Sequence, residues 1–211
     1  MTIIYFVRHG QSEANKQGII QGHAEFPLSD LGAKQAELVG NKLADLPLDA
    51  VYTSDLQRAF LTAEQIAKHH ELAPAAVSYL REVGLGPLEG KTREQMRAEF
   101  PDMKSDSLLT SGIKGTEQIE EITERCRIAT ESLKNSPGEN IAAVSHGGLI
   151  SILLMYMIAG EDWHLLKRPF VIGNTGITKV EVSENGPKIH YMNQTAHLEL
   201  EENLQSSTVV Y

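Results

Sequence analysis

The sequence predicts an α/β fold: a three-layer sandwich with a mostly parallel central sheet, helices on both faces and one antiparallel edge strand. The first observation is that short apolar and β-branched runs alternate with amphipathic helical stripes, an order typical of parallel sheets. The second is that polar, glycine-containing turns follow several of these runs. The third is the turn Glu184-Asn185-Gly186 between the last two runs, which favours a hairpin and therefore an antiparallel edge.

Each expected element follows from its local pattern. Strands are expected where β-branched, aromatic or other apolar residues form short runs bounded by turn residues, at residues 2–7, 49–53, 76–80, 141–145, 176–182 and 188–193. Helices are expected where apolar residues return every three or four positions, at residues 31–46, 56–67, 92–100, 119–133 and 149–159. Ser29 is the expected N-cap of the first helix, and Ser54 or Asp55 that of the second.

Length and composition indicate a single domain. A chain of 211 residues with 41% hydrophobic content can bury one sizeable core. We assign residues 1–199 to that domain and residues 200–211 to a polar C-terminal tail. The pattern contains no internal repeat and no interdomain linker, and it leaves the oligomeric state open.

Charge and targeting signals argue against several classes of partner. The net charge of −9 and the pI near 5.4 argue against nucleic-acid binding, which needs a basic face. The most apolar stretch, residues 149–159, is far shorter than the ~20 residues that span a bilayer, and residues 1–7 lack the features of a signal peptide. The single cysteine, Cys126, permits neither an intrachain disulfide nor a four-thiolate zinc site. We therefore expect no membrane partner and a cytoplasmic location.

Polar residues gather where three of the expected strands end. Arg8-His9-Gly10 follows the first strand, residues 54–58 the second, and Ser145-His146-Gly147-Gly148 the fourth. Ligands of open α/β sheets bind beyond the carboxyl ends of the strands, so two histidines and two arginines are expected to share one rim. Glycines let a ligand approach the backbone closely, and a helix that begins after His146 aims N–H groups at an anion. The rim therefore predicts an anion site.

Each of these residues has an ordinary interpretation when it is taken alone. A lone histidine at the end of a strand is more often structural than catalytic. Arg58, in the first turn of a helix, would be a solvated surface cation. Glu82, in the loop after the third expected strand, would be a surface carboxylate. Their combination at one rim is what favours a functional site.

Six segments of the chain follow one another in an order that is specific as a set, although the tripeptide Arg8-His9-Gly10 is weak by itself. They are Arg8-His9-Gly10-Gln11-Ser12 with Asn15; Gln21-Gly22; Pro27-Leu28-Ser29 with Leu31-Gly32 and Gln35-Ala36; Tyr52-Thr53-Ser54-Asp55-Leu56 with Arg58-Ala59 and Thr62-Ala63; Leu80-Arg81-Glu82; and Val144-Ser145-His146-Gly147. In this set the chain resembles the histidine phosphatase superfamily, in its phosphoglycerate-mutase-like branch. The resemblance extends from residue 3 to about residue 150 and more weakly to about residue 198.

The resemblance implies a role for each matching residue. It implies a phosphatase that hydrolyses monoesters of small phosphorylated metabolites through a phosphohistidine on His9, without a metal or a cofactor. Glu82 would be the proton donor to the leaving oxygen. The phosphate pocket would be built from Arg8, Asn15, Gln21, Gly22, Arg58, His146 and Gly147.

These residue types suit phosphoryl transfer. Charge develops on the phosphoryl oxygens, so positioning and electrostatic stabilisation dominate catalysis. Two arginines and a cationic His146 can take the place of metal ions. The attacking nitrogen of His9 must be unprotonated, with the other ring nitrogen held by an acceptor such as a backbone carbonyl. A general acid contributes about 10²- to 10⁴-fold in rate, so loss of the nucleophile should cost more than loss of Glu82.

The first alternative is a phosphoglycerate mutase, which uses the same pocket but returns the phosphoryl group to its product. The family's glycolytic mutases resemble one another in a Glu-Arg-His-Tyr-Gly segment at the acid, where this chain has Glu82-Val83-Gly84-Leu85-Gly86. The family's usual tryptophan before the motif asparagine is Ala14 here, and its arginine two places before Gln-Gly is Ile19. These departures remove polar groups that would hold a second anion, and they favour the phosphatase.

Three interpretations from other classes are weaker. A non-catalytic phospho-ligand-binding module on the same fold would be expected to have lost at least one of the catalytic side chains. A P-loop that ends at Gly90-Lys91-Thr92 would need its first glycine at position 85, which is Leu85. A metal hydrolase could use His69-His70, or His23 near Glu25, but adjacent helical histidines diverge and are more typical of a solvated face.

The leaving group is expected to be chosen by the loop of residues 85–115, which should cover the pocket. Phe26, Leu85 and Leu88 suggest an apolar rim there, and each of them is equally compatible with a place in the core. The sequence therefore predicts the class of reaction and leaves the phosphate ester open.

Overall fold

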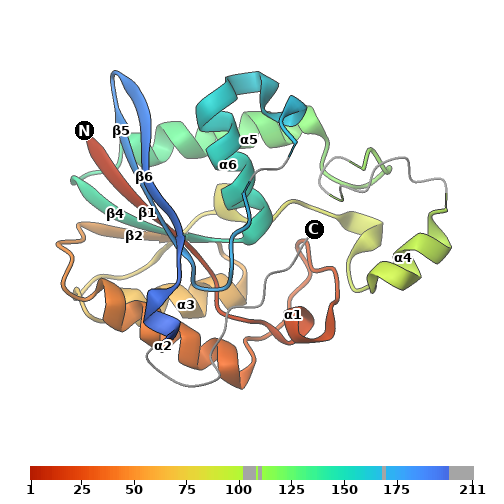
Figure 1. Cartoon of the computed structure of the whole chain (residues 1–211), viewed down its shortest axis with the longest axis horizontal. Coiled ribbons are helices and arrows are strands. Elements are labelled where there is room, and N and C mark those ends of the chain that lie inside the picture. Colours follow the sequence, from red (N-terminus) through yellow and green to blue (C-terminus); the bar gives the residue numbers. More distant parts are fainter. Residues whose placement is uncertain (102–107, 109–110, 168–169, 200–211) are drawn as a thin grey trace.

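The computed structural model describes residues 1–101, 108, 111–167 and 170–199, so the expected polar tail at residues 200–211 lies outside the described residues. The described chain forms a six-stranded sheet, in the order β3-β2-β4-β1-β5-β6, with helices on both faces (Figure 1). The strands are β1 Thr2–Arg8, β2 Ala50–Thr53, β3 Ala75–Ala76, β4 Asn140–Ser145, β5 Ile177–Ser183 and β6 Gly186–Gln194. The α-helices are α1 Glu13–Gln17, α2 Asp30–Leu43, α3 Gln57–Ala67, α4 Arg93–Glu99, α5 Ile119–Lys134 and α6 Gly147–Ala159.

The sheet is parallel through its first four strands. β4 pairs in parallel with both β1 and β2, and β2 pairs in parallel with β3. The C-terminal hairpin adds β5 antiparallel to β1 and then β6 antiparallel to β5, so β6 forms one edge. The predicted α/β class, with a mostly parallel sheet and an antiparallel edge, is therefore confirmed.

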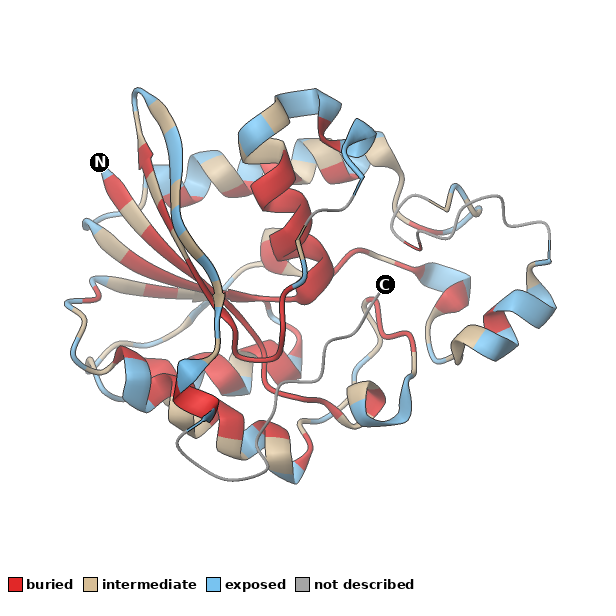
Figure 2. Ribbon diagram, viewed as in Figure 1, coloured by how far each residue is buried: buried red, intermediate tan, exposed pale blue. Residues whose placement is uncertain are grey.

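Two hydrophobic cores pack against the two faces of the sheet (Figure 2). Because side chains alternate along a strand, Tyr5 and Val7 of β1 join the core beneath α2 and α3, whereas Ile4 and Phe6 join the core beneath α5 and α6. α6 is buried from Gly147 to Met155, as its apolar sequence predicts. Packing on both faces therefore fixes the register of the strands, and with it the position at which each strand ends.

The capping predictions have different outcomes. The hydroxyl of Ser29 accepts the Gly32 N–H at 3.0 Å, so the expected cap of α2 is confirmed. The expected cap of α3 at Ser54 or Asp55 is wrong: the N-cap position is Leu56, with no side-chain cap hydrogen bond of its own. The carboxylate of Glu25 accepts the Gln57 N–H instead, at 3.2 Å, and Ser54 is turned toward the rim of the sheet.

The third strand is much shorter than the predicted span of 76–80. Only Ala75–Ala76 pairs with β2, and residues 78–80 form a 3₁₀ turn. The Val77 N–H still donates to the Thr53 carbonyl at 2.8 Å, after which the chain turns inward and buries Leu80 completely. The hydroxyl of Ser145 donates to the Leu80 carbonyl at 2.7 Å and anchors this turn. The turn leads directly into the segment that carries Glu82.

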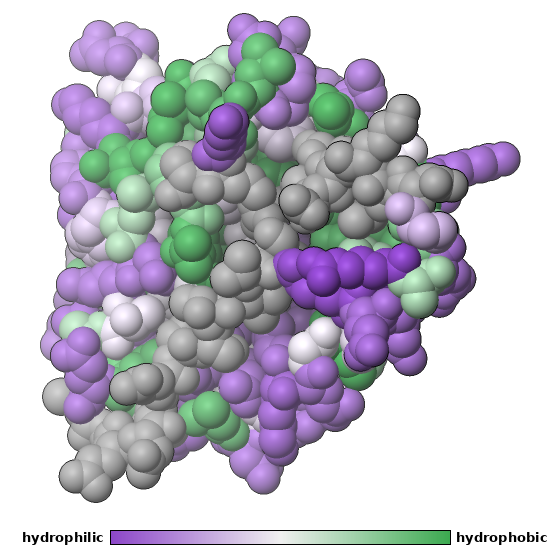
Figure 3. Space-filling model, turned by 45° about the vertical axis from the view of Figure 1, so that its right-hand side comes forward, coloured by the Kyte–Doolittle hydropathy of each residue, from purple (hydrophilic) through white to green (hydrophobic). Residues whose placement is uncertain are grey.

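The described helices include none that is long and apolar enough to cross a membrane. On the face that comes forward in Figure 3, hydrophilic and hydrophobic residues are interspersed. Cys126 lies in α5 and is buried, and this burial raises the pKa of its thiol to about 12. The thiol therefore behaves as a small apolar core group.

A comparison of two leucines tests this account of the core. Leu153→Ala should lower the free energy of unfolding by about 2–5 kcal/mol, because Leu153 is fully buried in α6 and the truncation leaves a cavity. Leu165→Ala, at a side chain that is 70% exposed, should change it by less than about 0.5 kcal/mol. Urea unfolding of both variants measures the difference, and equal costs would contradict the packing described above.

Candidate active site

His9 is the first residue after β1 and is almost completely buried. Its N–H donates to the Ser145 carbonyl at 3.0 Å, which extends the pairing of β1 with β4 by one residue. Its ring Nδ1 lies 2.6 Å from the Gly10 carbonyl, so Nδ1 carries the proton and Nε2 carries the lone pair. Burial, together with the charges of Arg58 and Arg8, holds the pKa of His9 well below its ordinary value. The geometry thus keeps the ring neutral, with one nitrogen able to attack.

Two fully buried guanidinium groups flank this histidine. Arg8 ends β1, and its Nη1 donates to the Ile172 carbonyl at 2.7 Å. Arg58 lies in the first turn of α3, and it donates to the carbonyls of Gly22 and Ala24 at 2.8 and 2.9 Å. Arg58 is therefore not the surface cation that its helical position suggests when it is considered alone. Backbone carbonyls orient both cations.

His146 follows β4 and precedes α6. Its ring lies edge-on to that of His9, with the centroids 5.0 Å apart, and its Nε2 is 2.9 Å from the Ser54 hydroxyl. Its Nδ1 is buried and has no hydrogen-bond partner among the described residues. Burial, and then the charge of Arg58, hold the pKa of His146 well below its ordinary value. The protein alone therefore keeps this ring neutral, and the expected cationic form would require a bound anion to raise the pKa.

The side chain of Glu82 packs against the N-terminus of α6. Its carboxylate accepts the N–H groups of Val83, Gly148 and Leu149 at 3.0, 3.1 and 2.9 Å. A Cβ on Gly148 would lie 2.5 Å from Glu82 Oε1, so the close approach requires a glycine at position 148. The helix N-terminus was expected to face a ligand anion. Two of its N–H groups instead hold this buried side chain, so Glu82 is not a surface carboxylate.

The remaining predicted phosphate contacts surround these groups and touch the residues that hold them. Asn15 Oδ1 accepts the Ser12 N–H at 3.2 Å, and Gln21 Oε1 accepts the Ser12 hydroxyl at 2.8 Å. The Gly22 carbonyl accepts Arg58, as described above. A Cβ on Gly147 would lie 3.2 Å from Arg8 Nε, so this glycine also permits a close approach. In the contacts that the structure describes, these residues hold the backbone and side chains around His9, Arg8 and Arg58.

Two positions that sequence reasoning missed hold the backbone of His9, the predicted nucleophile. Asn174 Nδ2 donates to the His9 carbonyl at 3.0 Å and to Asn15 Oδ1 at 3.3 Å. The Thr175 N–H donates to the Arg8 carbonyl at 3.0 Å from a left-handed conformation, with φ +53°. Strained backbone of this kind clusters at functional sites. The one local signal in the sequence is a short polar group just before a strand, which is too common to be specific.

The expected apolar rim is only partly correct. Leu85 and Leu88 are fully buried and belong to the core beneath α5 and α6. Phe26 is partly exposed. An apolar wall close to the site comes instead from Ala14, Ile19 and Ile20, which line a cavity between α1 and α4.

Comparison with known proteins places this chain and its fold in a family. The model of the histidine phosphatase superfamily, branch 1, matches residues 4–195. PhoE of Bacillus subtilis, an uncharacterized phosphatase, is 30% identical over 199 residues, which cover 94% of this chain and 97% of PhoE. The structure of YhfR from Bacillus stearothermophilus has a TM-score of 0.83 and 27% identity, over 93% of this chain and 99% of YhfR. A mutant phosphoserine phosphatase from Entamoeba histolytica in complex with phosphoserine has a TM-score of 0.73 and 26% identity, over 94% of this chain and 100% of that chain.

The chain therefore belongs to the histidine phosphatase superfamily, branch 1. It is a phosphoric monoester hydrolase of this family. Similar proteins named as phosphatases occur among both the curated relatives and the solved structures, and some curated relatives are named as probable phosphoglycerate mutases, so the mutase alternative has less support. The predicted family, enzyme class and fold are confirmed. The roles of the individual side chains stay predictions.

The buried histidines give stability a pH dependence whose sign follows from their pKa values. Unfolded His146 takes up a proton near pH 6.5, whereas the folded ring, with its lowered pKa, does not. The free energy of unfolding should therefore fall as pH drops below about 6.5, by up to about 1.4 kcal/mol per pH unit for each such histidine. Urea unfolding of His146→Asn should show a shallower fall between about pH 6.5 and 5.5 than the unmodified protein.

His69→Asn is the matched control, because His69 is exposed on the molecular surface. It should leave the slope against pH unchanged. An identical slope for His146→Asn and the unmodified protein would contradict the neutral, buried state of the rim.

Proposed function

We propose that this chain hydrolyses monoesters of small phosphorylated metabolites through a phosphohistidine on His9, without a metal. The observation that carries the proposal is the state of His9, a buried neutral ring whose Nδ1 is tied to the Gly10 carbonyl between two buried arginines. A neutral imidazole nitrogen can attack phosphorus, and this attack divides hydrolysis into two easier steps. Arg8 and Arg58 supply fixed positive charge for the phosphoryl oxygens.

In the first step, His9 Nε2 forms a bond to phosphorus while the bond to the ester oxygen breaks. Glu82 gives a proton to that leaving oxygen, and the alcohol departs. In the second step, a water molecule attacks the phosphohistidine, loses its proton to Glu82 and releases phosphate. His146, whose Nδ1 is buried beside His9, would donate to a phosphoryl oxygen once the anion raises its pKa.

Water rather than a second substrate is the proposed acceptor. In the mutase pattern of the family, polar residues follow the acid. Here Val83 and Leu85 are fully buried in the core, so neither side chain can hold a second anionic group. Their burial supports the hydrolase.

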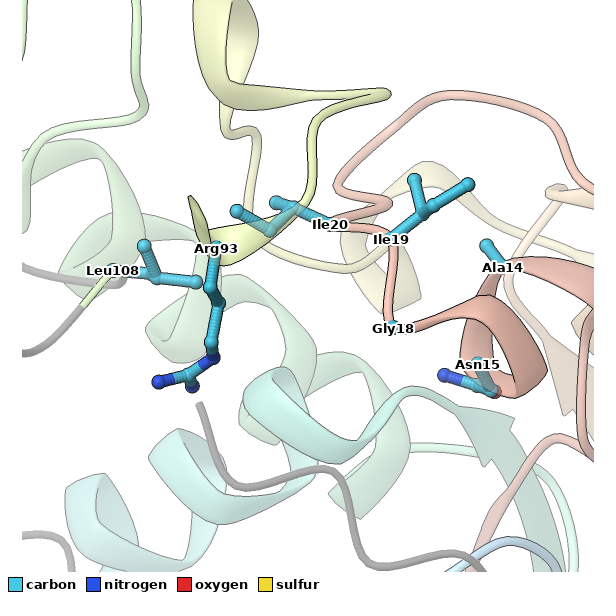
Figure 4. A pocket seen from close by; sticks show the side chains of 7 residues that line it. All are labelled: Ala14, Asn15, Gly18, Ile19, Ile20, Arg93 and Leu108. Atoms are coloured by element: carbon cyan, nitrogen blue, oxygen red, sulfur yellow. The ribbon is translucent and has the colours of Figure 1, made fainter. Parts of the chain in front are cut away.

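The size of the leaving group is suggested by a cavity of about 110 Å³ between α1 and α4 (Figure 4). Asn15 lines it and accepts from Asn174, which also donates to the His9 carbonyl, so Asn174 connects the wall of the cavity to the backbone of His9. Ile20 lines it and directly precedes Gln21 and the Gly22 that holds Arg58. The lining of the cavity is therefore connected to the residues that hold His9 and Arg58.

The lining of the cavity indicates the chemistry of the leaving group. Ala14, Ile19, Ile20 and Leu108 are apolar, and Arg93 lies across the cavity from Asn15 (Figure 4). An apolar cavity of about 150 Å³ holds benzene, and pockets for drug-sized ligands exceed about 300 Å³. We therefore propose esters of small alcohols with a short carbon skeleton. Phosphoserine, which the Entamoeba histolytica structure holds, belongs to this class.

The nucleophile is tested by His9→Ala with p-nitrophenyl phosphate. The variant should lose at least about a thousand-fold in kcat, because only binding and electrostatic stabilisation remain without the nucleophile. Denatured wild-type protein should carry acid-labile ³²P after reaction with a labelled ester, and the variant should carry none. Retention of most of the activity by His9→Ala would refute the mechanism.

Two controls accompany this test. Activity should survive a strong chelator, and vanadate should inhibit, because it mimics phosphorus in the transition state. Activity that is lost with the chelator and returns with zinc or magnesium would contradict a metal-independent site. His190→Ala, at an exposed position on β6, should leave kcat unchanged.

The leaving-group cavity is tested by filling it. Ile19→Trp should lower kcat/KM for phosphoserine and similar small esters by about tenfold or more, because the indole occupies the space of the alcohol. Inhibition by vanadate should not change, because the phosphate pocket is left intact. Leu61→Trp on the exposed side of α3 is the matched control. An unchanged kcat/KM for Ile19→Trp would show that the alcohol binds elsewhere.

A further inference from the structure

Arg125 of α5 and Glu117 form a bidentate ion pair behind the candidate acid. Arg125 Nε lies 2.7 Å from Glu117 Oε1, and Arg125 Nη2 lies 2.7 Å from Glu117 Oε2. The two side chains are only 14% and 15% exposed. No motif of the sequence analysis includes either residue, and the proposed reaction does not use them directly.

Both partners of this ion pair also form hydrogen bonds with the backbone of residues 81–84. Arg125 Nη1 donates to the Arg81 carbonyl at 2.6 Å, and Nη2 reaches the Glu82 carbonyl at 3.4 Å. Glu117 Oε2 accepts the Gly84 N–H at 2.9 Å, and the Glu117 N–H donates to the Gly84 carbonyl at 2.8 Å. The ion pair therefore holds the segment on both sides of Glu82.

The segment depends on these contacts because it belongs to neither a helix nor a strand. Buried backbone groups outside regular structure need side-chain partners, and here the ion pair supplies several of them. His23 Nε2 adds a contact to the Glu82 carbonyl at 2.7 Å. Contacts with α5 and the Glu117 segment thus hold the backbone of Glu82, while the N–H groups of α6 hold its carboxylate.

A second ion pair that involves α5, between Arg127 and Glu124, provides a comparison. Arg127 is also bidentate, to Glu124, but these side chains are 46% and 56% exposed. Exposed pairs of this kind contribute little to stability. A largely buried pair has a desolvation cost that its own attraction often fails to offset, so it is weak evidence for a role in stability alone. A role in fixing the position of the Glu82 segment accounts better for the buried pair of Arg125 and Glu117.

We propose that Arg125 and Glu117 are positioning residues for proton transfer by Glu82. They fix the backbone from which the acid projects, and so set the position of its carboxyl group against the leaving oxygen. The inference rests on the proposed function of Glu82 as general acid. A misplacement of about 1 Å can cost about 10²-fold in rate, so a small shift of this segment is sufficient to impair catalysis.

The leaving group distinguishes this role from a merely structural one. A nitrophenolate is a stable anion and leaves without a proton, whereas an alkoxide must be protonated as it departs. Displacement of the acid should therefore lower kcat/KM, which reports the phosphorylation step, for alkyl esters and spare it for p-nitrophenyl phosphate. The later attack of water on the phosphohistidine is common to both substrates, so kcat does not distinguish them. General damage to the fold or to the phosphate pocket would slow both substrates alike.

The experiment compares phosphoserine with p-nitrophenyl phosphate for Arg125→Lys and Glu117→Gln. Lysine keeps the charge but loses the planar fork, and glutamine is nearly isosteric, so one of the two variants should fold even where the other does not. We expect kcat/KM, which reports the phosphorylation step, to fall by about 10- to 100-fold for phosphoserine and to change by less than about threefold for p-nitrophenyl phosphate. Arg127→Lys, in the exposed pair, should change neither rate.

A double-mutant cycle with Glu82→Gln separates failure of this inference from failure of the proposed function. If Glu82 is the acid, Glu82→Gln alone discriminates between the two substrates, and Arg125→Lys added to it has little further effect. Equal losses on both substrates for Arg125→Lys, or full additivity with Glu82→Gln, would overturn the positioning role. If Glu82→Gln itself does not discriminate, it is the assignment of the acid that is wrong.

Discussion

The parallel pairing of β1 with β4 is the constraint on which the rest of the site depends. It sets Arg8 opposite Ser145, and the His9 N–H extends the same register. Because both strands end at one level, the histidines that follow them are neighbours, with ring centroids 5.0 Å apart. A slip of one residue would turn every side chain of β1 to the other face. The hydrophobic cores on both faces therefore determine the distance between the two rings.

The same rim buries two guanidinium groups in a chain whose net charge is −9. Removal of such cations from water is costly, and carbonyl groups of two irregular loops offset part of that cost. A carbonyl group carries no net charge, so these contacts orient the two cations without cancelling their charge. It also acts on its surroundings, because it helps to keep both buried histidines neutral. The same two charges thus belong to the proposed anion site and keep the proposed nucleophile, His9, neutral.

The sequence predicts those parts of the molecule whose signals are local. A strand that ends in a glycine turn is a short pattern, so the sheet class and the rim that carries His9 and His146 could be predicted. Asn174 and Thr175 act across about 165 residues of chain on backbone groups, and no short pattern marks such contacts. An apolar residue in a loop fits a rim or a core equally well, and Leu85 proved to belong to the core. In the sequence, Ala14 is notable only because the family usually has a tryptophan at this position. In the structure, Ala14 lines the cavity between α1 and α4.

The chemistry of the single cysteine has a consequence for the conditions under which the enzyme can work. Enzymes that use a thiolate nucleophile are silenced when peroxide oxidises it, since the thiolate is the reactive form. The nucleophile proposed here is an imidazole, and Cys126 is a buried thiol with a pKa of about 12. Neither group offers peroxide a reactive sulfur. Turnover should therefore continue through oxidative stress that stops cysteine-dependent phosphatases.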